Sequence, residues 1–220
     1  MGTYLAELGF NLDFAPSADL SVVDGNAAGS SSYGSEADNV ASFVGYMQAG
    51  LQEQKVTACI GQFPGIGSST RARRTAWHLQ TEVRKISEPM NLQYSRAVLI
   101  PVRPNDHRQQ YGSTFPDRRQ YSLLPVRCGG NGYLRNELNF RGVIVSGAMN
   151  EAAISNYYGA DEAAVLALRA GCDMIYAPEN FETAYNGVLE AVQNGTISEE
   201  RINDSLRRIY RIKYADKLEQ

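Results

Sequence analysis

The sequence holds few cysteines, and they do not cluster. Its 220 residues include three cysteines, Cys59, Cys128 and Cys172, which lie far apart and form no C-x-x-C pair. An odd, sparse set of this kind makes neither a disulfide framework nor a zinc site. We therefore expect no bound metal, and we expect Cys59 and Cys172, each in an apolar run, to be small buried side chains.

Long hydrophobic runs and an excess of charge are also missing. No apolar run approaches the roughly 20 residues that a membrane-spanning helix needs. Twenty-four acidic and 21 basic residues give a net charge of −3, so no general attraction to nucleic acids or anionic membranes is expected. No signal-peptide pattern opens the chain. These absences predict a soluble protein without nucleic-acid or membrane partners, and they favour the cytoplasm.

Nucleotide-binding motifs are absent as well. Neither G-x-G-x-x-G nor G-x-x-x-x-G-K-[ST] follows a predicted strand, which argues against a dinucleotide or P-loop site, and no cofactor is expected. The glycine pair at Gly65 and Gly67 is interpreted as a tight turn rather than an anion site. The basic segment 68–90 is interpreted as a solvated loop rather than an RNA contact, because the whole chain is acidic.

What the sequence does contain is a series of short apolar strands that alternate with helices. Strands are predicted over 11–18, 56–63, 97–102, 142–146 and 173–177, and helices over 36–54, 129–138, 160–170, 182–194 and 198–216. The polar segment 103–126 is predicted to be an extended loop. This alternation predicts one α/β domain over 1–220, built on a parallel sheet that is either open and doubly wound or a (β/α) barrel.

Six blocks of sequence narrow this choice. In chain order they are ELGFNLDFAPSAD, SSYGSEADNVASFVGYMQAGLQ, FPG-x-G, LRNELNFRGVIVSGAMNEAAISNYYG, EAAVLALRAGCDMIYAP and AYNGVLEAVQNGTISEERINDSLRRIYRIK. Together, from about Tyr4 to Lys213, they resemble the catalytic barrel domain of glycoside hydrolase family three, in particular its β-N-acetylhexosaminidase-like branch.

The resemblance implies a TIM-type barrel with its active site at the carboxyl ends of the strands. It implies a retaining mechanism, in which one carboxylate attacks the anomeric carbon and a second group protonates the leaving oxygen. Only five of the eight β/α units of such a barrel are recognisable here, because the family has three further strands before the one at 11–18. Three outcomes are therefore possible: a second chain supplies the missing strands, the five units close in a different way, or the protein self-associates. Of these we expect self-association or a second chain.

The positions where the family carries its chemistry are substituted. The aspartate nucleophile that should follow Ser146 reads Gly147. The family motif K-H-F-P-G-H-G has lost its lysine and both histidines, at Gly61, Gln62 and Ile66. The arginine of R-S-F-G reads Ser31, a further histidine reads Val102, and the D-x-H acid dyad aligns with Ala76-Trp77-His78.

Three hypotheses follow from these substitutions. The first is a domain with carbohydrate-related ancestry and no hydrolysis, because glycine cannot act as a nucleophile. Under this hypothesis His78 is the only residue that remains at the positions of the family's catalytic groups. The substrate-binding residues are Ser31, Gln62, Ser146 and Gly147, and Ile66 and Val102 are expected beside them in one sugar-binding depression.

The second hypothesis is an active hydrolase whose carboxylate has moved to Glu151, although a glutamate at the head of a helix is explained equally well by the helix N-terminus. The adjacent pair Asp106-His107 is interpreted as solvated. The third hypothesis is a non-enzymatic or redesigned half-barrel scaffold that binds a ligand or a partner chain.

Overall fold

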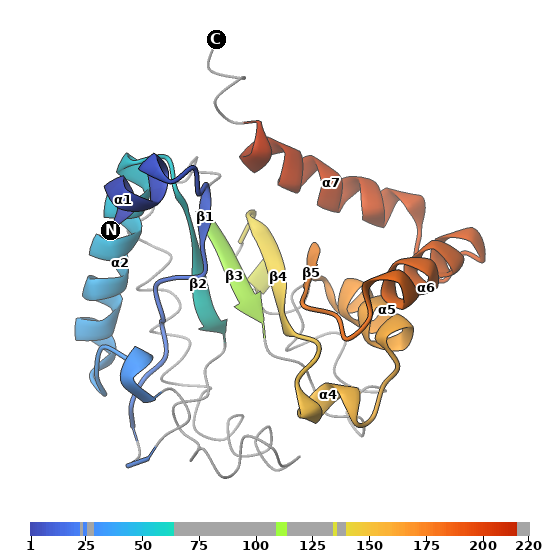
Figure 1. Cartoon of the computed structure of the whole chain (residues 1–220), viewed down its shortest axis with the longest axis horizontal. Helices are drawn as coiled ribbons and strands as arrows, with labels where there is room; N and C mark the ends of the chain where they lie inside the picture. Colours follow the sequence, from blue (N-terminus) through green and yellow to red (C-terminus); the bar gives the residue numbers. More distant parts are fainter. Residues whose placement is uncertain (23, 26–28, 64–108, 114–133, 136–139, 215–220) are drawn as a thin grey trace. The chain divides into compact units, whose positions relative to one another are not determined.

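The computed structural model describes residues 1–22, 24–25, 29–63, 109–113, 134–135 and 140–214 (Figure 1). The chain divides into two compact units, Met1–Thr114 and Phe115–Gln220. Several predictions lie outside the described residues. They are the strand at 97–102, the helix at 129–138 except for residues 134–135, the turn at residues 65–67, the loop at 68–90, and the site residues Ile66, His78, Val102 and the pair 106–107. The single domain over 1–220 stays a prediction.

The first unit is built on three parallel strands. It contains α1 (Gly2–Glu7), β1 (Leu12–Asp13), the short 3-10 helix η1 (Gly29–Ser31), α2 (Ala37–Glu53), β2 (Thr57–Phe63) and β3 (Gln109–Ser113). β1 pairs with β2 in parallel, as predicted. β2 also pairs in parallel with β3, a strand that was not predicted. The expectation of an extended loop over 103–126 was wrong where β3 lies. The sequence of β3, QQYGS, has no apolar run, so the hydrophobic pattern gave no sign of this strand.

The strand predicted at 11–18 exists, but its regular part is short. Beyond Asp13 a single bridge joins Ser17 to Gly61, and Pro16 between them has no N–H to donate to a ladder. The helix predicted at 36–54 is confirmed as α2, and it buries Val40, Val44 and Leu51 at helical spacing. A core of Leu51, Val56 and Ala58 receives side chains from α1 and α2. Cys59 is buried in β2, as expected.

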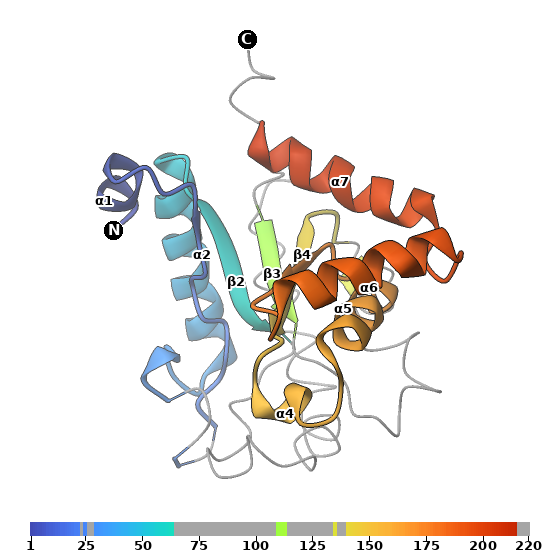
Figure 2. The same ribbon diagram turned by 45° about the vertical axis from the view of Figure 1, so that its right-hand side comes forward.

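The second unit contains two parallel strands and the C-terminal helices. Its elements are β4 (Val143–Ala148), α4 (Ala152–Ser155), α5 (Ala160–Ala170), β5 (Met174–Tyr176), α6 (Phe181–Gln193) and α7 (Glu199–Lys213). α5 ends at Gly171 with φ 109°, the left-handed conformation that glycine adopts at helix ends. α5 and α6 lie side by side (Figure 2) and share a core of Leu168, Ala191 and Ile197. The helices expected at 160–170 and 182–194 are confirmed. The helix expected at 198–216 is confirmed up to Lys213, where α7 ends, and residues 215–216 lie outside the described part of the chain.

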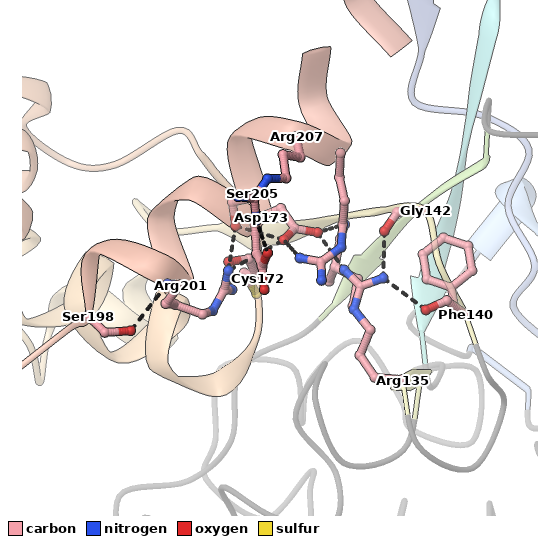
Figure 3. A network of polar contacts seen from close by, with 12 residues as sticks. Arg135, Phe140, Gly142, Cys172, Asp173, Ser198, Arg201, Ser205 and Arg207 are labelled. Carbon is pink, nitrogen blue, oxygen red and sulfur yellow. Dashed lines mark hydrogen bonds and ion pairs between the residues drawn. The ribbon is translucent and has the colours of Figure 1, made fainter. Parts of the chain in front are cut away.

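The last helix is fastened to the strands mainly by polar contacts (Figure 3). Ser205 is the only fully buried residue of α7. Its hydroxyl donates to Asp173 Oδ1 at 2.7 Å, and Arg208 Nη1 donates to the same oxygen at 2.9 Å. Arg135 Nη2 and the backbone N–H of Ile144 donate to Asp173 Oδ2 at 2.5 and 2.9 Å. One carboxylate therefore joins α7 to the amino ends of β4 and β5.

The two central charges of this network, those of Asp173 and Arg135, are buried, whereas Arg208 is partly exposed. The Asp173 side chain is 0% exposed and that of Arg135 is 8% exposed. Burial lowers the pKa of Arg135 to about 10, although the Asp173 carboxylate opposes this effect, so the guanidinium stays charged at neutral pH. Arg135 also donates to the carbonyls of Phe140 and Gly142. Among the described residues no helix is long and apolar enough to cross a membrane.

Candidate active site at the carboxyl end of β4

The carboxyl end of β4 is irregular at the slot that the sequence marks for the nucleophile. Val145 pairs with Met174, whereas Ala148 pairs with Tyr176. Three residue steps along β4 therefore match two along β5, and the extra residue forms a bulge over Ser146 and Gly147. Bulges bend a strand and change the direction of its side chains, and they are frequent beside active sites.

A side chain completes the hydrogen bonding that the bulge interrupts. The backbone N–H of Tyr176 donates to Ser146 Oγ at 2.9 Å, and this hydroxyl donates to the carbonyl oxygen of Gly147 at 2.8 Å. Ser146 is 2% exposed. The sequence analysis placed Ser146 among the ligand-binding residues; in the structure its hydroxyl bonds within the protein and holds the backbone of residue 147.

The carboxyl end of β5 is tied to the same segment. The backbone N–H of Met149 donates to the carbonyl oxygen of Tyr176 at 3.1 Å. Ala177, directly after the strand, has φ 45°, a left-handed conformation that is unfavourable for a residue with a Cβ. Residues held in such conformations are concentrated at functional sites.

Gly147 and Glu151 lie on the connection from β4 to α4. Gly147 is partly exposed and Glu151 is exposed. The N–H of Glu151 points to the carbonyl of Ala148 at 3.4 Å, and its own carbonyl accepts from Ile154 and Ser155. Its side chain makes no capping hydrogen bond to α4. In these described contacts Glu151 acts through its backbone at the start of a four-residue helix.

The first unit carries Ser31, Gly61 and Gln62. Ser31 is exposed in η1. Its neighbour Ser32 donates to the carbonyl oxygen of Asp19 at 2.7 Å, which fastens this loop to the chain that follows β1. A buried carboxylate at Asp19 was missed by the sequence analysis, although the string APSAD ends on it. These contacts place the loop bearing Ser31 beside the carboxyl end of β1.

Gly61 and Gln62 lie near the carboxyl end of β2. The N–H of Gly61 donates to the carbonyl of Pro16 at 3.1 Å, and its carbonyl accepts from Ala18. A Cβ at Gly61 would meet no atom within 4 Å, so the site has room for a side chain. Gly147 belongs to the other unit, and the common depression of Ser31, Gln62 and Gly147 stays a prediction.

The described part of the chain contains no cluster of side chains suited to binding a metal ion. There, no three His, Cys, Asp or Glu side chains lie together in an arrangement that could hold a metal ion. The burial of Cys59, with the negative charge of Asp13 nearby, raises the pKa of its thiol to about 12. The thiolate that binds metals and attacks electrophiles is therefore disfavoured at this position.

Comparison with known proteins places these features in a family. A sequence model described as the Glycosyl hydrolase family 3 N terminal domain matches residues 1–104 and 124–212. A beta-N-acetylglucosaminidase/beta-glucosidase of Cellulomonas fimi is 23% identical over 223 residues, which cover 97% of this chain and 40% of that protein. A beta-hexosaminidase of Shewanella frigidimarina is 28% identical over 184 residues, which cover 80% of this chain and 51% of that protein.

A solved structure agrees with the sequence comparisons. A glycoside hydrolase family 3 beta-N-acetylglucosaminidase from Paenibacillus sp. str. FPU-7 matches with a TM-score of 0.81 and 29% identity, over 100% of this chain and 42% of that one. The chain thus spans about half the length, or less, of these relatives. Because both the family model and the structural match extend over most of its length, the chain belongs to glycosyl hydrolase family 3 and has the TIM-barrel-like α/β fold of that domain.

Proposed function

We propose that this chain is a carbohydrate-binding family 3 domain that does not hydrolyse glycosides. The observation that carries the proposal is Gly147 at the β4 bulge. The hydroxyl of Ser146 and the edge of β5 hold the backbone of this slot, yet the slot bears no carboxylate. A retaining glycosidase needs such a group to attack the anomeric carbon.

The residues that would protonate the leaving oxygen support the same proposal. In the family pattern a lysine and a histidine stand where this chain has Gly61 and Gln62, and an aspartate orients the histidine that aligns with His78. The open space around a Cβ at Gly61 is consistent with the loss of a long side chain there. Catalytic groups that act as a unit are strongly non-additive, so several losses together leave little activity.

The proposed ligand is a β-linked N-acetylglucosaminide or glucoside. Two matched proteins are named beta-N-acetylglucosaminidase, and one of them is also named beta-glucosidase. A neutral sugar also suits a candidate site that contains Ser31, Gln62 and Gly147, because these uncharged residues offer hydrogen bonds or space.

The first experiment is a hydrolysis assay on the full chain with aryl N-acetyl-β-glucosaminide and aryl β-glucoside. We expect no turnover above a buffer blank, with binding of N-acetylglucosamine detected by ligand-observed NMR. Gly147→Asp serves as the restored variant, and Gly50→Asp on α2, where a Cβ meets no atom within 4 Å, serves as the control for adding a carboxylate elsewhere. Turnover by the unmodified chain would contradict the loss of hydrolysis, and absence of sugar binding would contradict the ligand.

A second candidate function is hydrolysis through Glu151, which lies four residues past Gly147 and is exposed. The same assay separates the two functions. If the unmodified chain turns substrate over and Glu151→Gln abolishes the activity, the carboxylate has moved. Glu199→Gln, at the start of α7, is the control for the removal of an exposed glutamate at a helix start.

Self-association is proposed in addition, with a second copy of the chain as the partner. Support comes from an exposed stripe on α6 formed by Phe181, Tyr185 and Leu189, spaced by four residues along one helix face. Contiguous apolar surface of this kind is characteristic of interfaces. Light scattering of the 24.2 kDa chain should give at least twice that mass, and Tyr185→Glu should lower it. A monomer at high concentration would contradict the proposal.

A further inference from the structure

We propose that Tyr176, at the carboxyl end of β5, forms an aromatic platform for the apolar face of a pyranose ring bound beside residue 147. The inference deepens the proposed carbohydrate-binding function and rests on it. Tyr176 was not among the predicted site residues, and it lies on β5, whereas residue 147 lies on β4.

The packing of β5 fixes the side of the strand on which the tyrosine lies. Ile175 packs into the core of Leu168, Ala191 and Ile197, beneath the helices. Successive side chains of a strand point to opposite faces. Tyr176 therefore points away from the helices, and it is 44% exposed.

The backbone of Tyr176 is adjacent to the slot itself. Its N–H donates to Ser146 Oγ and its carbonyl accepts from Met149, so its two bonding partners bracket Gly147 and Ala148. Ala148 is also its register partner across the two strands. A ring attached here begins one strand spacing, about 4.8 Å, from the β4 backbone at the slot.

The backbone also holds this residue in a fixed place. Hydrogen bonds at both its N–H and its carbonyl restrain the peptide units on either side of its Cα. The left-handed Ala177 follows at once, with Pro178 after it, so the chain turns sharply where the strand ends. A platform fixed before the ligand arrives loses less conformational freedom on binding than one on a mobile loop.

The chemistry of the side chain suits a neutral sugar. An exposed phenol combines a flat apolar ring, which can cover the C–H groups of a pyranose face, with a hydroxyl that can exchange hydrogen bonds with a sugar hydroxyl. Binding sites for small molecules commonly combine aromatic walls with a few polar groups.

The test is a ligand-observed NMR titration of the full chain with N-acetylglucosamine. Tyr176→Ala should weaken binding by roughly fivefold, the size expected for the loss of one aromatic contact. Tyr176→Phe should keep most of the affinity. Tyr46→Ala is the matched control, because Tyr46 is an exposed tyrosine on α2, 77% accessible, and it should leave the affinity unchanged.

Tyr176→Leu keeps apolar bulk without the aromatic face, and it decides the question if the alanine variant fails to fold. Circular dichroism and thermal melts check that each variant is folded. If folded Tyr176→Ala and Tyr176→Leu bind the sugar as tightly as the unmodified chain, the platform is overturned while the proposed function stands. If the unmodified chain binds no sugar, both the platform and the proposed ligand are overturned.

Discussion

The two ends of the β4–β5 pair differ in the side chains that they carry. At the amino ends, a buried carboxylate is surrounded by guanidinium groups from Arg135 and Arg208 and by the Ser205 hydroxyl. At the carboxyl ends, the nucleophile slot carries a glycine, and the hydrogen bonds around it come from the backbone and Ser146. In a barrel of this type, one end serves chemistry and the other stability. The charges that stabilise the fold are therefore present at one end, whereas the other end, under the proposed function, lacks the groups that would react.

The largest effect is expected when the stabilising end is broken. Asp173→Ala leaves the buried guanidinium of Arg135 without its carboxylate, and the loss of one member of a buried ion pair costs about 3–5 kcal/mol of unfolding free energy. Urea denaturation measures this loss. Asp204→Ala removes an exposed partner of Arg207 and should cost at most about 1 kcal/mol. Equal effects would show that Asp173 is not the main fastening of α7.

The next effect concerns the bulge. Ser146→Ala leaves the N–H of Tyr176 without its acceptor, and an unsatisfied buried donor costs about 1–3 kcal/mol. Ser42→Ala, which removes an exposed hydroxyl that bonds to a helix carbonyl, is the control and should change stability little. Urea denaturation measures both variants. An unchanged stability in Ser146→Ala would mean that another group or water accepts from Tyr176, and that the slot is held less firmly than its hydrogen bonds indicate.

A smaller effect on stability is expected at the start of α7, where the Ser198 helix cap can be removed without changing Asp173. Ser198 accepts from the N–H of Arg201 at 3.2 Å, so Ser198→Ala should cost about 1 kcal/mol. Thermal melting measures the change. Because the capped residue Arg201 also has its guanidinium 3.6 Å from Asp173 Oδ1, the double variant with Asp173→Ala should be non-additive. An additive result would show that the cap and the bonds to Asp173 act independently.

The smallest change in stability is expected from Gly147→Asp, although it alters the chemistry most directly. Gly147 is not among the described glycines with a positive φ, so aspartate can adopt its backbone and the melting temperature should shift little. Activity should recover slightly at best from this variant alone. Adding Gly61→Lys, Gln62→His and Ala76→Asp should raise the rate by more than the product of the single effects. High activity from Gly147→Asp alone would show that the acid side is intact.

The sequence allowed the second unit to be predicted better than the first. β4 and β5 are apolar runs, α5 ends at a glycine, and α6 and α7 have regular apolar spacing, so local patterns suffice. β3 has no such pattern. The bulge at Ser146 could not be foreseen, because it depends on the register between two strands. The bond from Arg135 to Asp173 joins residues 38 positions apart, and no local spacing indicates it.

The attachment of α7 has a consequence for how the molecule opens. The single fully buried residue of α7 is a serine, and α7 reaches the apolar core of the unit through the partly buried Ile202, so ion pairs and hydrogen bonds carry a large share of its attachment. We expect its amide hydrogens to exchange through local opening more readily than those of α5 and α6, which supply buried residues of that core. Added salt screens partly exposed charges such as Arg208 more than it weakens apolar packing, so ionic strength sets how often this helix detaches.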